Sequence, residues 1–327
     1  MNRKILIKTL LGSIALLLVL GIVYSGLRIL ESTGFFVQQE TSFTVQRKTI
    51  TKDGVRYFPR QDINVILVMG IDQEGPVTAS TEPNHGNAVD MAALVIFDEK
   101  AQTCSVLNIN RDTMVDMPML TEKGIEAGTW FGQLAYSHTY GTGVEDSCEN
   151  TKKTVSKLFG GINIDYYIAM NVDAVELMND AVGGVTVTIT DDFSNINPDM
   201  TMGEFTLKGR QARTFVQARW HIGDHLNLNR IERQKAYMDG FAEAFREKVR
   251  GSDGFVLSTY EKVAPYILSD LPISTLTGMV ERYADYEITR ILSLEGENIL
   301  GEEFYEFYPD EEKLEQLTLE LFYAPRA

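Results

Sequence analysis

An uncharged apolar run near the N-terminus limits most strongly what this chain can fold into. It extends from Thr9 to Leu27, is 19 residues long, and is bounded by Lys8 and Arg28. As a helix rising 1.5 Å per residue it spans roughly 28 Å, close to the hydrocarbon thickness of a bilayer. The run is longer than the apolar part of a usual signal peptide, and no clear small-residue cleavage site follows it. We therefore expect a retained membrane helix, with a cleaved signal peptide as the alternative.

The charges around this run predict its orientation and the layout of the chain. Arg3, Lys4 and Lys8 precede it, and an excess of basic residues favours the cytoplasmic side. The chain is thus expected at the cell membrane, with its N-terminus in the cytoplasm. The expected segments are a cytoplasmic tail over residues 1–8, a single-pass transmembrane anchor over 9–27, an irregular extracellular stalk over 28–61 and one extracellular domain over 62–327.

Charge and cysteine content narrow the classes of function. The chain has a formal charge of −16, and residues 1–28 hold four basic residues and no acid, so the remainder carries −20. Binding of nucleic acid depends largely on neutralising phosphates with basic residues, so we expect no nucleic acid as a partner. Cys104 and Cys148 could form a disulfide in an exported domain or remain two buried thiols, and both readings stay open.

Apolar runs alternate with amphipathic segments along the rest of the chain. The expected strands cover residues 64–69, 91–97, 105–109, 166–170, 185–189 and about 286–293. The expected helices cover about 147–159, with Ser147 as N-cap, then 172–181, 210–219, and 230–249, with Asn229 as N-cap. Residues 76–88, rich in Pro, Gly and Asn, are expected to form a long loop. Strands that alternate with helices indicate a layered α/β domain.

The first three strands predict a meeting of charged side chains. Asp72 follows the first strand, Asp90 precedes the second, and Arg111 and Asp112 follow the third. If these strands run antiparallel, with residues 98–102 as a hairpin turn, all four side chains lie at one edge of the sheet. Ligands bind at strand ends in open α/β sheets, and carboxylate oxygens suit Mg²⁺ held jointly with substrate phosphates. For any single aspartate a turn or cap role is the simpler reading, but the convergence favours a site.

A cationic segment in this acidic chain predicts an anion site. Residues 208–235 contain seven basic and two acidic residues, and guanidinium groups match phosphate oxygens with paired hydrogen bonds. Arg230, Arg233 and Gln234 share one face near the start of the expected helix, where unpaired N–H groups favour anions. Arg219 ends the preceding helix, so together these residues could hold a pyrophosphate. Three further basic residues of the segment are expected at the surface, as on a solvated helix face: Lys208, Arg213 and Lys235.

Four segments in a fixed order resemble the LytR-CpsA-Psr family of cell-wall glycopolymer transferases. They are NVILVMGID at 64–72, VDMAALVIFDEKAQTCSVLNINRDTMVDMP at 89–118, IDYYIAMNVDAVELMNDAVGGVTVTI at 164–189, and LKGRQARTFVQARW with NRIERQ within 207–234. The likeness extends from Asn64 to the LFY at 321–323. Each segment alone is weakly specific, whereas four in order with consistent spacing are strongly specific.

The resemblance implies a single αβα-sandwich domain with a mixed central sheet outside the membrane. It also implies transfer of a glycopolymer from an undecaprenyl-pyrophosphate carrier to a muramic-acid hydroxyl of peptidoglycan, with Mg²⁺ as cofactor. Teichoic acid, capsule and other anionic glycans all fit as the polymer. By motif, the expected metal ligands are Asp90, Asp112 and Asp72. The expected catalytic residues are Asp90, Arg111, Asp112 and Arg230, and the expected pyrophosphate ligands are Arg111, Arg219, Arg230, Arg233 and Gln234.

Three positions depart from the family pattern. Gln217 stands where the first arginine of an Arg-x-Arg pair is common, so one phosphate-binding charge is missing. Glu74 replaces a frequent arginine, and Asn110 replaces the usual proline before Arg-Asp-Thr. Gln217 supports an alternative, a polyprenyl-diphosphate binding protein or pyrophosphatase without transferase activity. A further alternative is an envelope-linked transcriptional regulator, but no helix-turn-helix pattern with a basic recognition helix is visible.

Overall fold

The computed structural model describes residues 49–326, except 83–85, 219–221, 223–226, 252–254, 272–274, 276–278, 280–281, 284–285 and 303. The expected membrane anchor and Arg219 therefore lie outside the described residues. The chain divides into two compact units, and each is described by itself. The sheet unit comprises Val37–Met170, Leu268–Leu271 and Thr289–Ala327, and the helical unit includes Asn171–Ile267 and Pro272–Ile288.

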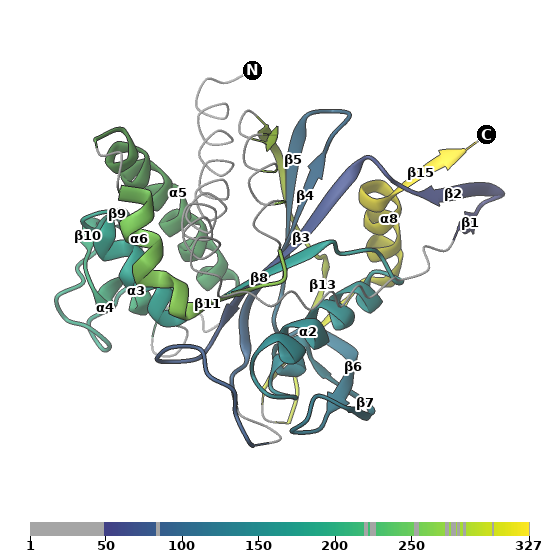
Figure 1. Cartoon of the computed structure of the whole chain (residues 1–327), viewed down its shortest axis with the longest axis horizontal. Coiled ribbons are helices and arrows are strands. Elements are labelled where there is room, and N and C mark those ends of the chain that lie inside the picture. Colours follow the sequence, from purple (N-terminus) through teal and green to yellow (C-terminus); the bar gives the residue numbers. More distant parts are fainter. Residues whose placement is uncertain are drawn as a thin grey trace. The chain divides into compact units, whose positions relative to one another are not determined.

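A six-stranded sheet dominates the sheet unit among the described residues. Its strand order is β11-β8-β3-β4-β5-β12 (Figure 1). The strands are β3 (Ile63–Ile71), β4 (Val89–Asp98), β5 (Thr103–Ile109), β8 (Tyr166–Asn171), β11 (Ile267–Ser269) and β12 (Glu287–Ser293). β4 pairs antiparallel with both β3 and β5. Its centre, from Ala92 to Phe97, is fully buried, as expected of a continuous apolar run covered on both faces.

Two helices share one hydrophobic core with this sheet. They are α2 (Glu145–Leu158) and α8 (Glu311–Phe322). Val155 of α2 and Phe322 of α8 lie in the same buried cluster as Leu67 and Leu94 of the central strands. Burying such side chains away from water contributes about 1.5–3 kcal/mol each, so this cluster holds the sheet unit together.

Three smaller sheets and one short 3₁₀ helix complete the sheet unit. Their elements are β1 (Ile50–Lys52), β2 (Val55–Pro59) and β15 (Tyr323–Arg326); β6 (Met114–Leu120), β7 (Glu126–Gln133) and η1 (Leu134–His138); and β13 (Gly296–Leu300) and β14 (Tyr305–Pro309). β1, β2 and β15 lie side by side, so the two ends of the described chain meet in one sheet (Figure 1). The irregular structure expected up to residue 61 was therefore wrong for residues 50–59. The segment boundaries at residues 8, 27 and 61 stay predictions.

The helical unit packs helices against a two-stranded sheet. Its elements are α3 (Val172–Ala181), β9 (Val185–Ile189), β10 (Gly203–Leu207), α4 (Arg210–Gln217), α5 (Asn227–Gly251), α6 (Phe255–Val263) and η2 (Ala264–Tyr266). The side chain of Asn171 caps α3 by accepting hydrogen bonds from the backbone N–H groups of Asp173 and Ala174, a standard N-cap arrangement. Phe193 stacks on Phe215 with ring centroids 5.9 Å apart, which joins the strand region to α4.

Most helices and strands expected from the sequence are present in the structure, but two helices begin at other residues than expected. The mixed α/β class with a mixed central sheet is confirmed. α2 begins at Glu145, so Ser147 lies inside it, where its hydroxyl donates to the Tyr140 carbonyl. α5 begins at Asn227, so Asn229 is not its N-cap. α4 ends at Gln217, two residues earlier than expected. In both helices the residue expected as N-cap lies within the first turn instead of before it.

Candidate functional site at the edge of the central sheet

The antiparallel register gathers charged residues at one edge of the central sheet. Ile71 pairs with Val89 across β3 and β4, and Ala92 pairs with Ile109 across β4 and β5. The three strands therefore present Asp72, Asp90 and the segment that begins at Asn110 at the same edge. This arrangement confirms the strand directions on which the sequence-based expectation depended.

Arg111 is the centre of this group. Its guanidinium forms an ion pair with Asp90, and its Nε lies 3.7 Å from Asp112 Oδ1. The side chains of Arg111 and Asp90 are 19% and 15% exposed, while that of Asp112 is only 1% exposed. A guanidinium between two carboxylates that keeps part of its surface exposed is a charged cluster that a ligand can contact. We refer to Asp90, Arg111 and Asp112 as the edge cluster.

The segment that carries the edge cluster is held by hydrogen bonds within its own turn. The Asn110 side chain accepts from the backbone N–H of Asp112 at 3.0 Å, and the Thr113 hydroxyl donates to the Asn110 carbonyl at 2.6 Å. Asn110 stands where the family commonly has proline. Its side-chain bond gives this turn a hydrogen-bonded constraint in place of the fixed φ of a proline.

Neighbouring elements hold the same segment from outside. The backbone N–H groups of Leu134 and Ala135 donate to the carbonyls of Thr113 and Arg111 at 2.8 and 2.9 Å. Phe307 of β14 donates from its backbone N–H to the Asp112 carbonyl at 2.9 Å. These contacts fix the backbone on which both charged side chains are mounted.

Gln133 is a site residue that the sequence did not suggest. It is 7% exposed, and its Nε2 donates to the Tyr305 carbonyl at 2.7 Å and to Asp112 Oδ1 at 3.4 Å. It therefore orients the Asp112 carboxylate. A glutamine at the end of an otherwise exposed strand has no local signature, because its role depends on β14, which lies far away in the sequence.

The edge cluster offers oxygen ligands for a cation. Asp90 and Asp112 supply two carboxylates, whereas Asp72 is exposed and its backbone N–H donates to the Ala88 carbonyl at 2.8 Å. Within the described residues, no three acidic, histidine or cysteine side chains lie close enough together to hold a metal ion. Mg²⁺ is usually held by one or two protein carboxylates, with substrate phosphates and water completing its shell. Two carboxylates fit that pattern, and the metal assignment, including Asp72, stays a prediction.

The expected pyrophosphate ligands belong to the helical unit. Arg230 and Arg233 of α5 are buried, 3% and 5% exposed respectively. Arg233 donates from Nε to the Phe215 carbonyl at 3.0 Å and also to the Ala218 carbonyl, and its Nη1 lies 2.6 Å from Asp191 Oδ2. Burial lowers the pKa of this guanidinium, and Asp191 opposes that effect. Arg233 therefore already has a structural role at the end of α4.

Gln234 has a related role at the same place. Its Nε2 donates to the Val216 carbonyl at 3.2 Å. The last carbonyls of a helix have no partner within that helix, so Gln234 and Arg233 together cap the C-terminus of α4. Gln217, at the end of α4, accepts from Arg213 Nε at 2.8 Å, and Arg213 lies 3.5 Å from Asp173. Arg213, expected as a surface charge, is thus paired and only 15% exposed.

The structure brings together some members of each expected group. Asp90, Arg111 and Asp112 meet within the sheet unit, and Arg233 and Gln234 meet at the end of α4 within the helical unit. Arg219 lies outside the described residues. The meeting of the two groups around a single pyrophosphate stays a prediction.

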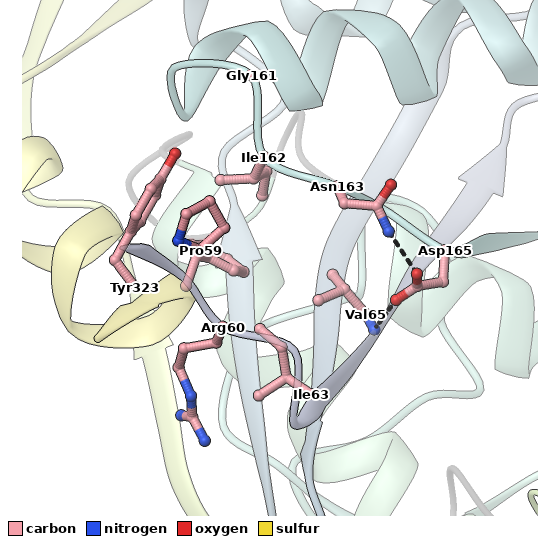
Figure 2. Close-up of a pocket in the computed structure, with 10 residues that line it drawn as sticks. Pro59, Arg60, Ile63, Val65, Gly161, Ile162, Asn163, Asp165 and Tyr323 are labelled. Atoms are coloured by element: carbon pink, nitrogen blue, oxygen red, sulfur yellow. Dashed lines mark hydrogen bonds between the residues drawn. The ribbon is translucent and has the colours of Figure 1, made fainter. Parts of the chain in front are cut away.

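A separate pocket lies at the other end of β3. Figure 2 shows it between Pro59, Ile63, Ile162 and Tyr323, with the Arg60 side chain directed away from it. The polar groups at its wall already bond to each other: Asp165 accepts from the Val65 backbone N–H at 2.8 Å and from the Asn163 side chain. The pocket is therefore a gap between packed elements, remote from the edge cluster.

The two cysteines are free and buried. Cys104 lies in β5, where burial raises the pKa of its thiol to about 12. Cys148 lies in α2, 3.6 Å from His138 Nε2, and burial followed by nearby acids raises its pKa well above the usual value. Of the two readings left open by the sequence, the buried thiols are correct.

Comparisons with known proteins place the fold. The LytR_cpsA_psr family profile matches residues 31–322. TagT of Bacillus subtilis (strain 168), a polyisoprenyl-teichoic acid–peptidoglycan teichoic acid transferase by name, is 25% identical over 276 residues, which cover 80% of this chain and 77% of TagT. Among the described residues, which begin at 49, we find no helix long and apolar enough to cross a bilayer.

Solved structures show the same fold. The structure of TagT bound to LI-WTA has a TM-score of 0.59 at 21% identity and covers 88% of this chain and 98% of that one. The protein gbs0355 of Streptococcus agalactiae has a TM-score of 0.61 at 18% identity, covering 80% of this chain and 86% of that one. With the family profile matched over most of its length, this chain belongs to the LytR-CpsA-Psr family.

Proposed function

We propose that this protein is a membrane-anchored phosphotransferase that moves an anionic glycopolymer from an undecaprenyl-pyrophosphate carrier to peptidoglycan. The observation that carries the proposal is the edge cluster, in which Arg111 lies between Asp90 and Asp112 at the end of the central strands. It occurs in a chain of a family whose relative TagT is named as a teichoic acid transferase. We extend that activity and a single αβα-sandwich domain to this chain.

The proposed reaction is a displacement at phosphorus. A muramic-acid hydroxyl attacks the phosphorus nearer the sugar, a phosphodiester forms, and the bond to the carrier phosphate breaks, so undecaprenyl phosphate leaves. Positioning and charge neutralisation supply most of the rate in such reactions. Arg111 would neutralise phosphate charge, and Asp112, oriented by Gln133, is the candidate base for the hydroxyl proton.

Other residues complete the proposed site. In the cationic segment at residues 208–235, the proposed pyrophosphate ligands are Arg219, Arg230 and Gln234. Arg233 supports them through its contacts with the end of α4. Mg²⁺, held by Asp90 and Asp112 together with phosphate oxygens, would supply further charge neutralisation. The carboxylate chemistry of the edge cluster supports this assignment.

The test uses the purified full chain with carrier-linked glycan, Mg²⁺ and peptidoglycan. The expected products are polymer joined to peptidoglycan by a phosphodiester and free undecaprenyl phosphate in equal amounts. A chelator, with Mg²⁺ added back, checks the metal requirement. Polymer transfer by the Asp90→Ala protein at the wild-type rate would contradict the site.

A second candidate is supported by Gln217. This neutral residue bonds to Arg213 within α4, at a position where the family commonly carries a phosphate-binding arginine. A protein that hydrolyses polyprenyl diphosphate with water would release carrier phosphate and polymer phosphate, whereas a protein that only binds it would release neither. In both cases no linkage to peptidoglycan would form. The same assay separates the two, because only transfer consumes peptidoglycan.

The proposed location is the outer face of the cell membrane. The apolar run at residues 9–27 and the basic residues before it support a single-pass anchor with the N-terminus in the cytoplasm. Protease added to intact protoplasts should then degrade the chain from Arg28 onward. Full protection of the chain from that protease would contradict the orientation.

A further inference from the structure

Trp130 is a half-exposed aromatic residue on the hairpin beside the edge cluster. It lies in β7 and is 40% exposed. Its cross-strand partner in β6 is Met117, which is fully buried in the core of the sheet unit. Residues directly opposite each other in an antiparallel pair point to the same face. The indole therefore leaves the hairpin on its inner face and reaches solvent at the rim of the core.

The neighbouring residues hold the indole in one place. Gly132 shares the face of Trp130, and a side chain there would come within 2.5 Å of the six-membered ring of the indole. The absence of a side chain at Gly132 thus gives the ring its space. The rings of Tyr136 and Tyr140 contact the indole edge-on, with centroids 5.8 and 6.4 Å away. We refer to Trp130, Tyr136 and Tyr140 as the aromatic platform.

The platform and the edge cluster share one stretch of backbone. Gln133, three residues after Trp130, contacts the Asp112 carboxylate. The backbone N–H of Ala135, next to Tyr136, donates to the Arg111 carbonyl at 2.9 Å. The segment 130–140 therefore carries an exposed aromatic surface and also holds the backbone of the charged site. A ligand that occupied both would be fixed by a single rigid element.

We propose that the aromatic platform binds a pyranose ring of the acceptor glycan strand, an inference that rests on the proposed transfer to peptidoglycan. The C–H face of a sugar ring carries a slight positive charge and lies well on the negative face of an indole, while tyrosine hydroxyls offer hydrogen bonds at its edge. Stacking on aromatic side chains is also how flexible polymers are held without a deep pocket.

Charge and exposure distinguish this occupant from two others. The hairpin from Met114 to Gln133 carries three acids, Asp116, Glu122 and Glu126, against one base, Lys123. This balance repels an anionic donor polymer more than the sugar rings of a glycan backbone. A polyprenyl tail is stabilised by enclosure in an apolar cavity, whereas the indole is open to solvent at the rim.

The test measures the affinity of the purified full chain for soluble oligosaccharides of alternating N-acetylglucosamine and N-acetylmuramic acid. Titration calorimetry is expected to show a roughly tenfold weaker affinity for Trp130→Ala, as is typical of losing one stacking partner. Trp130→Phe should keep most of the affinity. Gly132→Ala should weaken binding comparably, because its methyl group displaces the indole. Phe131→Ala is the matched control, since Phe131 is 52% exposed and points to the opposite face.

Three binding results would overturn the inference. They are unchanged glycan affinity in both Trp130→Ala and Gly132→Ala, a loss confined to the anionic donor polymer, and a loss confined to the polyprenyl carrier. Thermal unfolding of each variant checks that it is folded. If the Trp130→Ala protein fails to fold, the Trp130→Phe protein, which retains an aromatic ring, is compared with Gly132→Ala instead. Glycan binding through Trp130 in a chain that transfers nothing would overturn the proposed function alone. Transfer with an unaltered KM for peptidoglycan in the variants would overturn the platform alone.

Discussion

Arg233 on α5 forms an ion pair of 2.6 Å with Asp191, which follows β9. The same guanidinium donates to two carbonyls at the end of α4 and lies 5.8 Å from the centre of the Phe193 ring. One side chain thus joins α5, the end of α4 and the segment after β9. Gln217, which departs from the family pattern, lies at the same end of α4 that Arg233 contacts.

We expect Arg233→Ala to lower the free energy of unfolding by about 3 kcal/mol, because removing one partner leaves Asp191 and the α4 carbonyls buried without their donors. Arg233→Lys should recover only part of this loss, since an ammonium group lacks the planar fork that reaches three acceptors. Urea unfolding at neutral pH measures both. Arg210→Ala, at an exposed position of α4, should change stability by less than about 0.5 kcal/mol. Equal stability of the Arg233→Ala and wild-type proteins would show that the contacts of Arg233 contribute nothing to the free energy of unfolding.

The edge cluster predicts a loss of activity without a loss of fold. Asp90→Asn and Arg111→Ala should each lower the transfer rate by about 10²–10³-fold, the usual effect of removing one charge-assisted contact from a transition state. Circular dichroism and the urea midpoint should show that the fold persists. Glu204→Gln, an exposed position in β10, should transfer at the wild-type rate. If both site variants transfer polymer at the wild-type rate, the reaction does not take place at the edge cluster.

Gln133 predicts a smaller and more specific effect. Gln133→Met keeps the length of the side chain but removes the hydrogen bonds to Asp112 and the Tyr305 carbonyl. Because Gln133 orients the Asp112 carboxylate, which is the candidate base, this variant should lower the transfer rate by about tenfold. Its affinity for the carrier should stay at the wild-type value, and steady-state assays that separate the rate from the KM for the carrier measure both. A wild-type transfer rate would show that Gln133 does not position Asp112.

The free cysteines predict a simple labelling result. A thiol reagent reacts with the thiolate, and burial raises the pKa of Cys104 to about 12 and that of Cys148 well above its usual value. At about pH 8 the native chain should therefore react very slowly, while the chain unfolded in guanidinium should show two thiols without a reductant. Thiols that appear only after reduction would mean that the two residues are bridged.

The sequence predicted the parts of the site that depend on strand ends. Asp90, Arg111 and Asp112 were placed by counting along three strands, because antiparallel neighbours return to the same edge. Arg233 was assigned to pyrophosphate from its spacing on a helix, but its structural partners, Asp191 and the Phe215 carbonyl, are 42 and 18 residues away in the chain. Spacing shows which face a residue occupies and not what that face contacts. For the same reason the sequence does not predict the role of Gln133 or the presence of the hairpin β6–β7.

Lys152 of α2 is the centre of a second charged cluster in the sheet unit. Its Nζ lies 2.5 Å from Asp270 and 3.1 Å from Glu149, and 5.6 Å from the centre of the Tyr167 ring. Asp270 also accepts from the Tyr167 backbone N–H at 2.6 Å. Burial lowers the pKa of Lys152, but the two carboxylates outweigh it and the net direction is upward. Burial raises the pKa of Glu149, against the opposing effect of Lys152.

Lys152→Met should therefore destabilise the chain by about 3 kcal/mol at neutral pH, because two carboxylates remain without their cation. Glu149 has a folded pKa above its ordinary value of 4.5, so protonation stabilises the folded state, and this contribution is lost as pH rises through the folded value. The penalty in Lys152→Met should accordingly shrink as pH falls toward about 4.5, where Glu149 takes up a proton. Urea unfolding at both pH values measures the change, with Lys100→Met, at an exposed turn, as control. A penalty that stays constant between the two pH values would show that the loss of stability does not arise from the unpaired Glu149 carboxylate.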